Sequence, residues 1–249
     1  MKLTIRRELV AVLATCLLFS LASSQPSDLE QWTLDQVLEK VTDANGGQES
    51  IDDVTNVRLS GTVEGGANTY DFVLLKKRPD KIRMRFMFRG TAIESGFNGE
   101  TGWRRQTRGD QSNVVELEGE ELAAMRLESD FDGPLIGEPN EDVTLKLERV
   151  ERIGRVDYFV ISEKTARRTA YHYIDSRTFR ELKVVTNRAN NNGELEESQN
   201  HYHEYSKHGG IWVAHMVERV LPDGRIEKIR IKEVEVNPGI LDLVFKKPD

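Results

Sequence analysis

The sequence predicts a mainly β protein (α+β) whose large curved antiparallel sheet forms a half-barrel, with helices covering the concave face. Segments with apolar side chains at alternate positions recur along the chain, and turns rich in glycine, asparagine or proline separate them. Helical spacing of apolar residues occurs in only two segments. Roughly ten or more strands in one sheet must curl, close or be covered, because two apolar faces cannot both meet water.

The first predicted helix covers residues 32–44. Thr33 is suited to cap it, Val37 and Val41 share one face, and Asn45-Gly46-Gly47 ends it. The second predicted helix covers residues 119–130, and a loop containing glycine and proline follows it at 132–140.

The remaining segments are predicted strands joined by short turns, and this succession favours one large sheet over two domains. The last strand changes its pattern, because Ile229 and Ile231 are odd-numbered whereas Val234 and Val236 are even-numbered. This switch predicts a β-bulge near Lys232–Glu233. The predicted strands are 54–63, 70–76, 82–88, 92–97, 102–106, 114–117, 143–153, 158–163, 169–174, 180–186, 196–205, 211–220 and 225–236.

The N-terminus is typical of a secretory signal peptide. Three basic residues precede an apolar run at 9–21, and small residues follow at 22–24. We expect residues 1–24 to be removed on export to the periplasm and 25–249 to form a single domain. The apolar run is too short for a comfortable membrane-spanning helix of about 20 residues.

Cys16 is the only cysteine of the chain. Its surroundings, Leu13-Ala14-Thr15-Cys16, resemble a lipoprotein processing site, which would anchor the protein through lipid. The alternative, which we prefer, is that Cys16 is an apolar residue of the discarded peptide. A mature chain without cysteine has no disulfide, no catalytic thiol and no cysteine–zinc site.

Composition and motifs exclude several classes of function. The net charge of −7 gives no attraction to nucleic acid. The sequence has no Gly-x-Ser-x-Gly elbow, no phosphate-binding loop and no dinucleotide fingerprint, so we predict no catalytic residues and no cofactor. His201, His203 and His215 offer a weak metal-site hypothesis. Solvated strand histidines are the simpler interpretation, and we predict no metal.

Aromatic and methionine side chains gather in residues 70–103, and such large, soft side chains line adaptable apolar pockets. The helix at 119–130 and the loop after it are a candidate for a movable cover, with a rigid structural helix as the alternative. The predicted lining of an apolar ligand-binding groove is Phe72, Leu74, Met84, Phe86, Trp103 and Met125.

An ordered series of motifs resembles the outer-membrane lipoprotein-sorting, or lipoprotein carrier, family (LolA/LolB-like). The match covers about residues 28 to 249, and no single motif is specific. The motifs are a helix and glycine stop at 37–47, Lys-Lys-Arg-Pro-Asp-Lys-Ile-Arg at 76–83, Gly-Phe-Asn-Gly-Glu-Thr-Gly-Trp at 96–103, Tyr-Ile-Asp-Ser-Arg-Thr at 173–178, and Asn237-Pro238-Gly239-Ile240 with Phe245 and Pro248.

The resemblance implies a half-barrel that carries acyl chains of lipoproteins or lipid between membranes, as a monomer, with a membrane-associated donor or acceptor protein as partner. The chain departs from the family pattern in its length, its charge and the segment around 128–142. The same fold also serves as a sensor domain, so the alternative function is a sensor or scaffold that binds a partner protein in the cell envelope.

Overall fold

The structure is a computed structural model that describes residues 28–137, 142–190 and 192–248. The predicted signal peptide 1–24, with Cys16, therefore lies outside the described residues, as does part of the predicted loop 132–140. None of the described helices is both long enough and apolar enough to cross a membrane.

Thirteen antiparallel strands of the described residues form one sheet. Each expected strand is present, with ends that differ slightly from the predicted ones. The strands are β1 (Asn56–Gly65), β2 (Asn68–Lys77), β3 (Lys81–Phe88), β4 (Thr91–Phe97), β5 (Gly102–Arg108), β6 (Gln111–Leu117), β7 (Thr144–Ile153), β8 (Val156–Lys164), β9 (Arg168–Asp175), β10 (Glu181–Ala189), β11 (Leu195–His208), β12 (Ile211–Val220) and β13 (Ile226–Val236).

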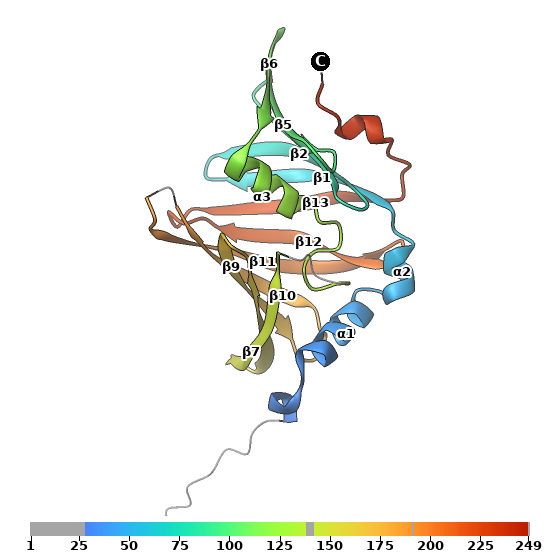
Figure 1. Ribbon diagram of the computed structural model, residues 1–249, viewed down its shortest axis with the longest axis vertical. Helices are drawn as coiled ribbons and strands as arrows, with labels where there is room; N and C mark the ends of the chain where they lie inside the picture. The colour runs from blue at the N-terminus through green and yellow to red at the C-terminus, as the bar shows by residue number, and fades with distance from the viewer. Residues whose placement is uncertain (1–27, 138–141, 191, 249) are drawn as a thin grey trace, which may run out of the picture.

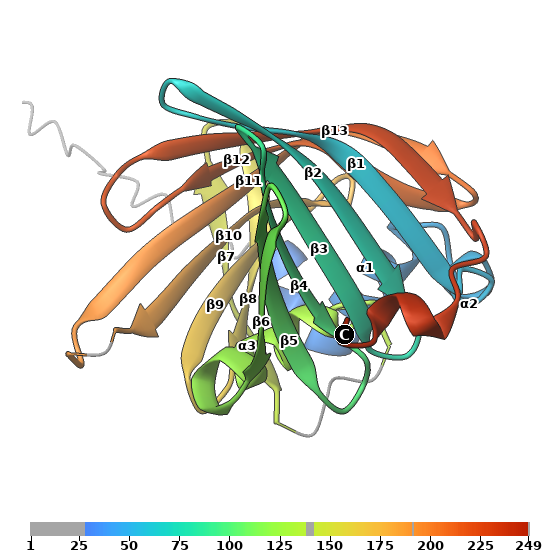
Figure 2. The same ribbon diagram turned by 90° about the horizontal axis from the view of Figure 1, so that it is seen from above.

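The sheet is open, with β6 and β7 at its two edges. From β1 the chain builds strands outward to β6, and after a connection it returns from β7 to β13, which pairs with β1 in the middle of the sheet. Figures 1 and 2 show the resulting curvature, with α1 and α3 on the inner side of the curved sheet. The predicted curved half-barrel, with helices on its concave face, is confirmed.

Three α-helices of the described residues accompany the sheet: α1 (Leu34–Ala44), α2 (Gln48–Asp52) and α3 (Gly119–Ser129). Thr33 caps α1 in a capping box with Gln36, so the predicted helix start is confirmed. The short α2 was not predicted. It begins after Gly47, whose φ of 83° is readily adopted only by glycine and lets the chain turn into a second helix.

The predicted bulge in the last strand is confirmed. Gly61 of β1 pairs with Ile231 of β13, but the preceding Ser60 pairs with Glu233, so Lys232 has no partner in β1. The extra residue shifts the alternation of side chains by one position, which keeps apolar residues on one face on both sides of the bulge.

Two apolar clusters of the described residues fix the helices against the sheet. α1 packs through Val37 and Val41 on Phe159 and Ile161 of β8. α3 packs through Met125 on a second cluster that includes Phe97 of β4. α1 and α3 thus cover strands in different halves of the sheet, and residues 132–136 after α3 lie over the concave face.

Candidate functional site

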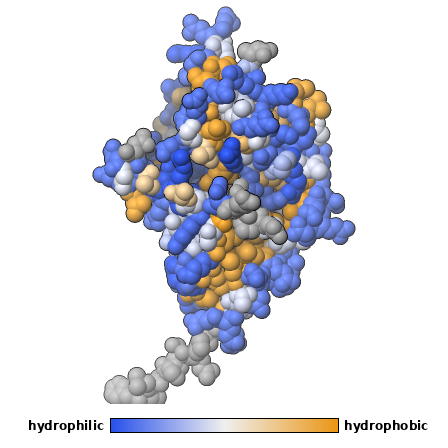
Figure 3. Space-filling view, viewed as in Figure 1, coloured by the Kyte–Doolittle hydropathy of each residue, from blue (hydrophilic) through white to orange (hydrophobic). Residues whose placement is uncertain are grey.

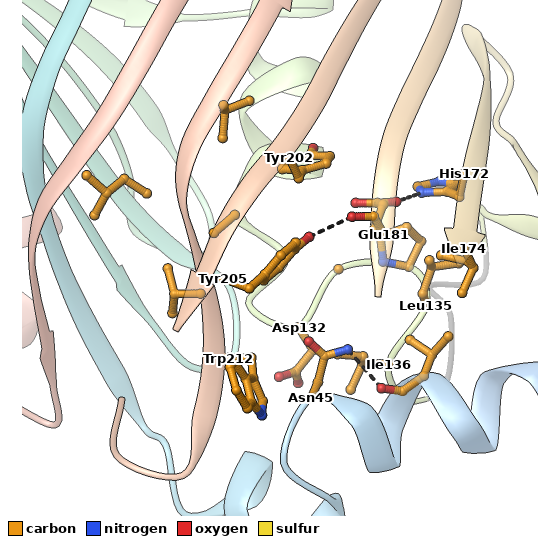
Figure 4. A pocket seen from close by; sticks show the side chains of 17 residues that line it. Asn45, Asp132, Leu135, Ile136, His172, Ile174, Glu181, Tyr202, Tyr205 and Trp212 are labelled. Carbon is orange, nitrogen blue, oxygen red and sulfur yellow. Dashed lines mark hydrogen bonds and ion pairs between the residues drawn. The ribbon is translucent and has the colours of Figure 1, made fainter. Parts of the chain in front are cut away.

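A cavity of about 380 Å³ lies on the concave face, between strands β9 to β13, the end of α1 and the loop that follows α3. Its volume falls within the range of about 300–1,000 Å³ that is typical of ligand pockets. Figure 4 shows its walls, with Tyr202, Tyr205 and Trp212 on one side and Leu135 and Ile136 on the other.

The loop residue Leu135 closes the cavity through apolar contacts. It is buried in the cluster that contains Val37 and Val41 of α1 and Ile174 of β9. Figure 3 shows apolar surface on the lower part of this face, where α1 lies in Figure 1. Opening the loop would therefore expose apolar surface of both the loop and the groove.

A break in strand β11 brings two tyrosines into the same wall. Tyr202 and Tyr205 are three residues apart and would lie on opposite faces of a regular strand. Glu204 between them has a φ of 57°, so the alternation changes at this residue. Tyr202 then lies opposite Val217 and Tyr205 opposite Ala214, and all four residues line the cavity.

The polar end of the cavity is a network of buried charges. His172 of β9 places Nδ1 2.6 Å from Oε1 of Glu181 and Nε2 3.1 Å from Oε2 of Glu163. Arg168 donates from Nη2 to Oε1 of Glu163 at 2.9 Å. Of these four residues, His172 and Glu181 line the cavity.

The network holds His172 in its charged form. Burial alone would lower its pKa, but the carboxylates of Glu181 and Glu163 outweigh burial and raise the pKa of His172 to about 9. Burial would raise the pKa of Glu163, but hydrogen bonds from His172 and Arg168 and their positive charges lower it. Because both ring nitrogens of the imidazolium donate to carboxylates, His172 is poorly placed to act as a general base.

Arg78, in the turn after β2, holds the loop that closes the cavity. Its Nη2 donates to Oδ1 of Asp132 at 2.6 Å and to the carbonyl of Ile51 at 2.9 Å, and its Nε donates to the carbonyl of Val54 at 2.7 Å. The guanidinium also lies 4.5 Å from the ring centroid of Phe131. We call the Arg78–Asp132 ion pair the loop latch.

Lys76 of β2 adds a second connection to the same loop. Its Nζ donates to the carbonyl oxygen of Asp130. Burial lowers the pKa of Lys76, and the negative charges of Glu128, Asp130 and Asp132 oppose that effect. The loop is therefore tied to the sheet through polar contacts as well as through Leu135.

Four of the residues predicted to line a groove share one face of two neighbouring strands. Phe72 pairs with Phe86 and Leu74 pairs with Met84 across β2 and β3. Met125 of α3 reaches the same face, where Leu74 and Met84 pack against its cluster. The structure thus brings five of the six predicted residues to one side, but none of them lines the 380 Å³ cavity.

In this half of the molecule α3 occupies the concave face. Met125 is only 8% exposed, and Leu122 packs in the same cluster. Beyond the helix the face carries exposed apolar side chains, since Phe86 is 39%, Ile93 44% and Val115 43% exposed. Phe86 and Ile93 are directly paired across β3 and β4, so the apolar surface is continuous between them.

Trp103, the sixth predicted residue, lies on the convex face and is not part of the groove. Its neighbour Gly102 faces Leu122 of α3, so by alternation Trp103 points the other way. There its Nε1 donates to the carbonyl of Phe245 at 2.9 Å, in the 3₁₀ turn η2 (Asp242–Phe245) near the C-terminus. The aromatic composition of the segment could not distinguish these two faces.

The histidines named in the metal hypothesis do not form one group. His215 places Nε2 2.8 Å from Nε2 of His208, whereas His201 pairs with Glu218 and His203 with Met216 across the strands. In the part of the chain that the structure describes, no group of three or more histidine, cysteine or acidic residues could hold a metal ion.

Sequence reasoning missed the cavity itself. Tyr202, Tyr205 and Trp212 were expected only as strand residues, and the network around His172 was not expected. A sequence signal did exist, because Tyr202 and Tyr205 break the period-two pattern of their strand.

Comparisons with known proteins support the fold. No protein-family model matches the chain, and no curated protein matches it in sequence. Among solved structures, a LolA superfamily protein from Nitrosomonas europaea aligns with a TM-score of 0.58 and 17% identity, covering 87% of this chain and 98% of that one. The chain has the LolA fold. The predicted resemblance to the lipoprotein carrier family is confirmed at this level.

Two further solved structures align with this chain to the same degree. A domain from Vibrio parahaemolyticus named for outer membrane lipoprotein sorting aligns with a TM-score of 0.58 and 14% identity, covering 86% of this chain and 96% of that one. A DUF1329 family protein from Desulfovibrio piger aligns with a TM-score of 0.58 and 13% identity, covering 86% of this chain and 97% of that one. Sequence identities this low establish only that the folds are alike, so the function has to be argued from the site.

Proposed function

We propose that this protein is a carrier that binds acyl chains of lipoproteins or lipids in its concave groove and serves outer-membrane lipoprotein sorting. The observation that carries the proposal is the 380 Å³ cavity beneath the loop that contains Leu135. A buried acyl chain gains about 0.8 kcal/mol for each CH₂ removed from water, so an apolar cavity of this kind favours such a ligand.

Cargo has to be released as well as bound, and this requires a cover that can move. We infer that residues 119–137 are this cover. The loop latch and the Lys76 contact hold it through a few polar groups, which can exchange with water when the cover opens. In the open state Phe72, Leu74, Met84 and Phe86 would extend the cavity along the face now occupied by α3, and Met125 would line it from the cover.

The cellular setting follows from the same proposal. Residues 1–24 would direct export to the periplasm, and 25–249 would act there as a single monomeric domain. A membrane-associated protein would donate or accept the cargo. Transfer depends on relative affinity, so the proposed function needs no catalytic residue, metal or cofactor.

Mass spectrometry of organic extracts from gently purified mature protein tests the proposal. Stoichiometric lipid or acylated peptide is the expected result. A variant that fills the cavity, Ala214→Phe, should lose this lipid, because Ala214 is a buried wall residue. Ala189→Phe is the matched control, since Ala189 is exposed at the end of β10.

Two results would contradict the proposed carrier function. Wild-type protein without lipid, which also fails to bind added fatty acid, would be the first. The second would be lipid that persists unchanged in the Ala214→Phe variant, because the cargo would then lie elsewhere.

The alternative is a sensor or scaffold that binds a partner protein, and one observation favours it. The edge strand β6 (Gln111–Leu117) is exposed along most of its length, so its unpaired backbone groups could accept a strand from another chain. A lipid-free protein that co-purifies with one envelope protein would support this function instead.

A further inference from the structure

Arg180 lies beside the cavity, just before β10. Its guanidinium carbon is 3.8 Å from the ring centroid of Trp212 and 6.0 Å from that of Tyr205, and both aromatic residues line the cavity. The guanidinium therefore lies against the cavity wall through cation–π contacts.

The charge of Arg180 has no acidic partner over residues 28–137, 142–190 and 192–248. The neighbouring carboxylate of Glu181 interacts with His172, and Arg180 takes part in none of the ion pairs of these residues. Its Nε is buried without a hydrogen-bond acceptor. A cation that lacks both an ion-pair partner and an acceptor for its buried N–H is unfavourable, so the site is suited to a negative charge supplied from outside.

The backbone before Arg180 fixes the position of this side chain. Phe179 has a φ of 53°, an uncommon conformation for a residue with a large side chain. Its ring packs in one cluster with Trp32 and Phe159, whose centroids lie 5.4 Å and 6.0 Å away. Strained backbone that packing maintains in this way is frequent at ligand-binding sites.

We propose that Arg180 binds the oxyanion of an amphiphilic ligand, a carboxylate or a phosphate, whose apolar chain occupies the cavity. The inference rests on the proposed function and narrows its ligand class to anionic amphiphiles. A guanidinium binds either oxyanion through two parallel N–H···O hydrogen bonds. Such an anion would supply the charge partner that Arg180 lacks among the described residues.

Isothermal titration calorimetry with three twelve-carbon amphiphiles below their micelle concentrations tests the inference. The probes are dodecanoate, dodecyl phosphate and an uncharged dodecyl polyethylene glycol ether. The wild type should bind at least one anion more tightly than the ether. Arg180→Gln should weaken that anion about tenfold, the loss typical of one charge-assisted hydrogen bond, and leave the ether unchanged.

Arg188→Gln is the matched control, because it removes the same charge from an exposed position near the end of β10, the strand that follows Arg180. Arg188→Gln should leave the affinity for all three probes unchanged. Whichever anion loses more affinity in Arg180→Gln identifies the headgroup, carboxylate or phosphate.

The outcomes separate the inference from the proposed function. If all three probes bind equally and Arg180→Gln changes none of them, Arg180 is not a headgroup site, although the carrier function stands. If Arg180→Gln and Arg188→Gln weaken the anions equally, the effect is one of net charge and the inference fails. If no probe binds to the wild type, the proposed function fails and the inference fails with it.

Discussion

Single residues in this protein carry charge in places where water is largely excluded. The network of His172, Glu163, Glu181 and Arg168 contains two positive and two negative charges, so its members balance one another. Breaking one partner of such a network costs more than the net contribution of the network, because the remaining charges stay buried. The free energy of unfolding should therefore depend on the protonation of these residues, and so on pH.

Stability should fall between pH 6.5 and 9. The pKa of His172 is about 9 in the folded protein against about 6.5 when unfolded. A group whose pKa is raised by folding stabilises the folded state fully at pH values below the pKa that it has in the unfolded chain. This contribution disappears as the pH rises through the pKa that it has in the folded protein. We expect the free energy of unfolding to drop by up to about 3 kcal/mol over this interval.

Urea unfolding at pH 6 and at pH 9.5 measures this effect. His172→Gln should be less stable than the wild type at pH 6 and should show a much smaller change with pH. His203→Gln, two strands away in β11, serves as the control and should keep the change seen in the wild type. An equal pH dependence in His172→Gln and the wild type would exclude His172 as its source.

At the scale of elements, a close approach between β4 and β5 fixes the C-terminal segment on the convex face. Gly96 of β4 pairs with Trp103 of β5, and a Cβ at Gly96 would lie 2.6 Å from the Trp103 ring. The ring lies over the glycine and donates its N–H to the carbonyl of Phe245. The glycine thus makes room for an indole that holds the chain end.

Gly96→Ala should destabilise the protein by about 1–3 kcal/mol, because the Trp103 ring has to move and its hydrogen bond with Phe245 is disturbed. Gly65→Ala is the matched control in β1, since the nearest atom to its new Cβ would be the flexible Glu227 side chain at 3.4 Å. Thermal unfolding compares the two variants. A Gly96→Ala variant as stable as Gly65→Ala would show that the indole adapts without cost.

The elements were largely predictable because alternation and turn residues are local signals. The bulge at Lys232 was predictable for the same reason, since the apolar residues of β13 change parity there. The side of Trp103 was not predictable, because alternation separates two faces without stating which one is concave. The cavity was not predictable either, since it depends on the irregular residue Glu204 and on contacts between distant segments.

At the scale of the whole molecule, the thirteen strands of the described residues form one open sheet, and residues 119–137 lie over its concave face. The pairing of β1 with β13 links the two halves of the chain, so the sheet is continuous beneath both helices. The cover is tied to this frame through Leu135, Met125, Lys76 and the loop latch. The sheet would therefore stay intact if residues 119–137 move as proposed.

Breaking the loop latch should loosen the cover without unfolding the sheet. Asp132→Asn keeps the shape of the side chain but removes its charge, and Arg78 retains its bonds to the carbonyls of Ile51 and Val54. A half-buried bidentate ion pair contributes about 1.5–3 kcal/mol, so the open state should become at least about tenfold more populated. Release of a bound fluorescent fatty acid, followed by stopped flow, should accelerate by a similar factor.

Glu121→Gln provides the matched control, because it removes one negative charge from the cover at an exposed pair with Arg104. Exposed pairs contribute only about 0–1 kcal/mol, so this variant should release the fatty acid at nearly the rate of the wild type. If Asp132→Asn also releases at that rate while binding as tightly, the latch does not limit opening. The contacts of Leu135 and Met125 would then hold the cover, and cavity-forming substitutions there would accelerate release instead.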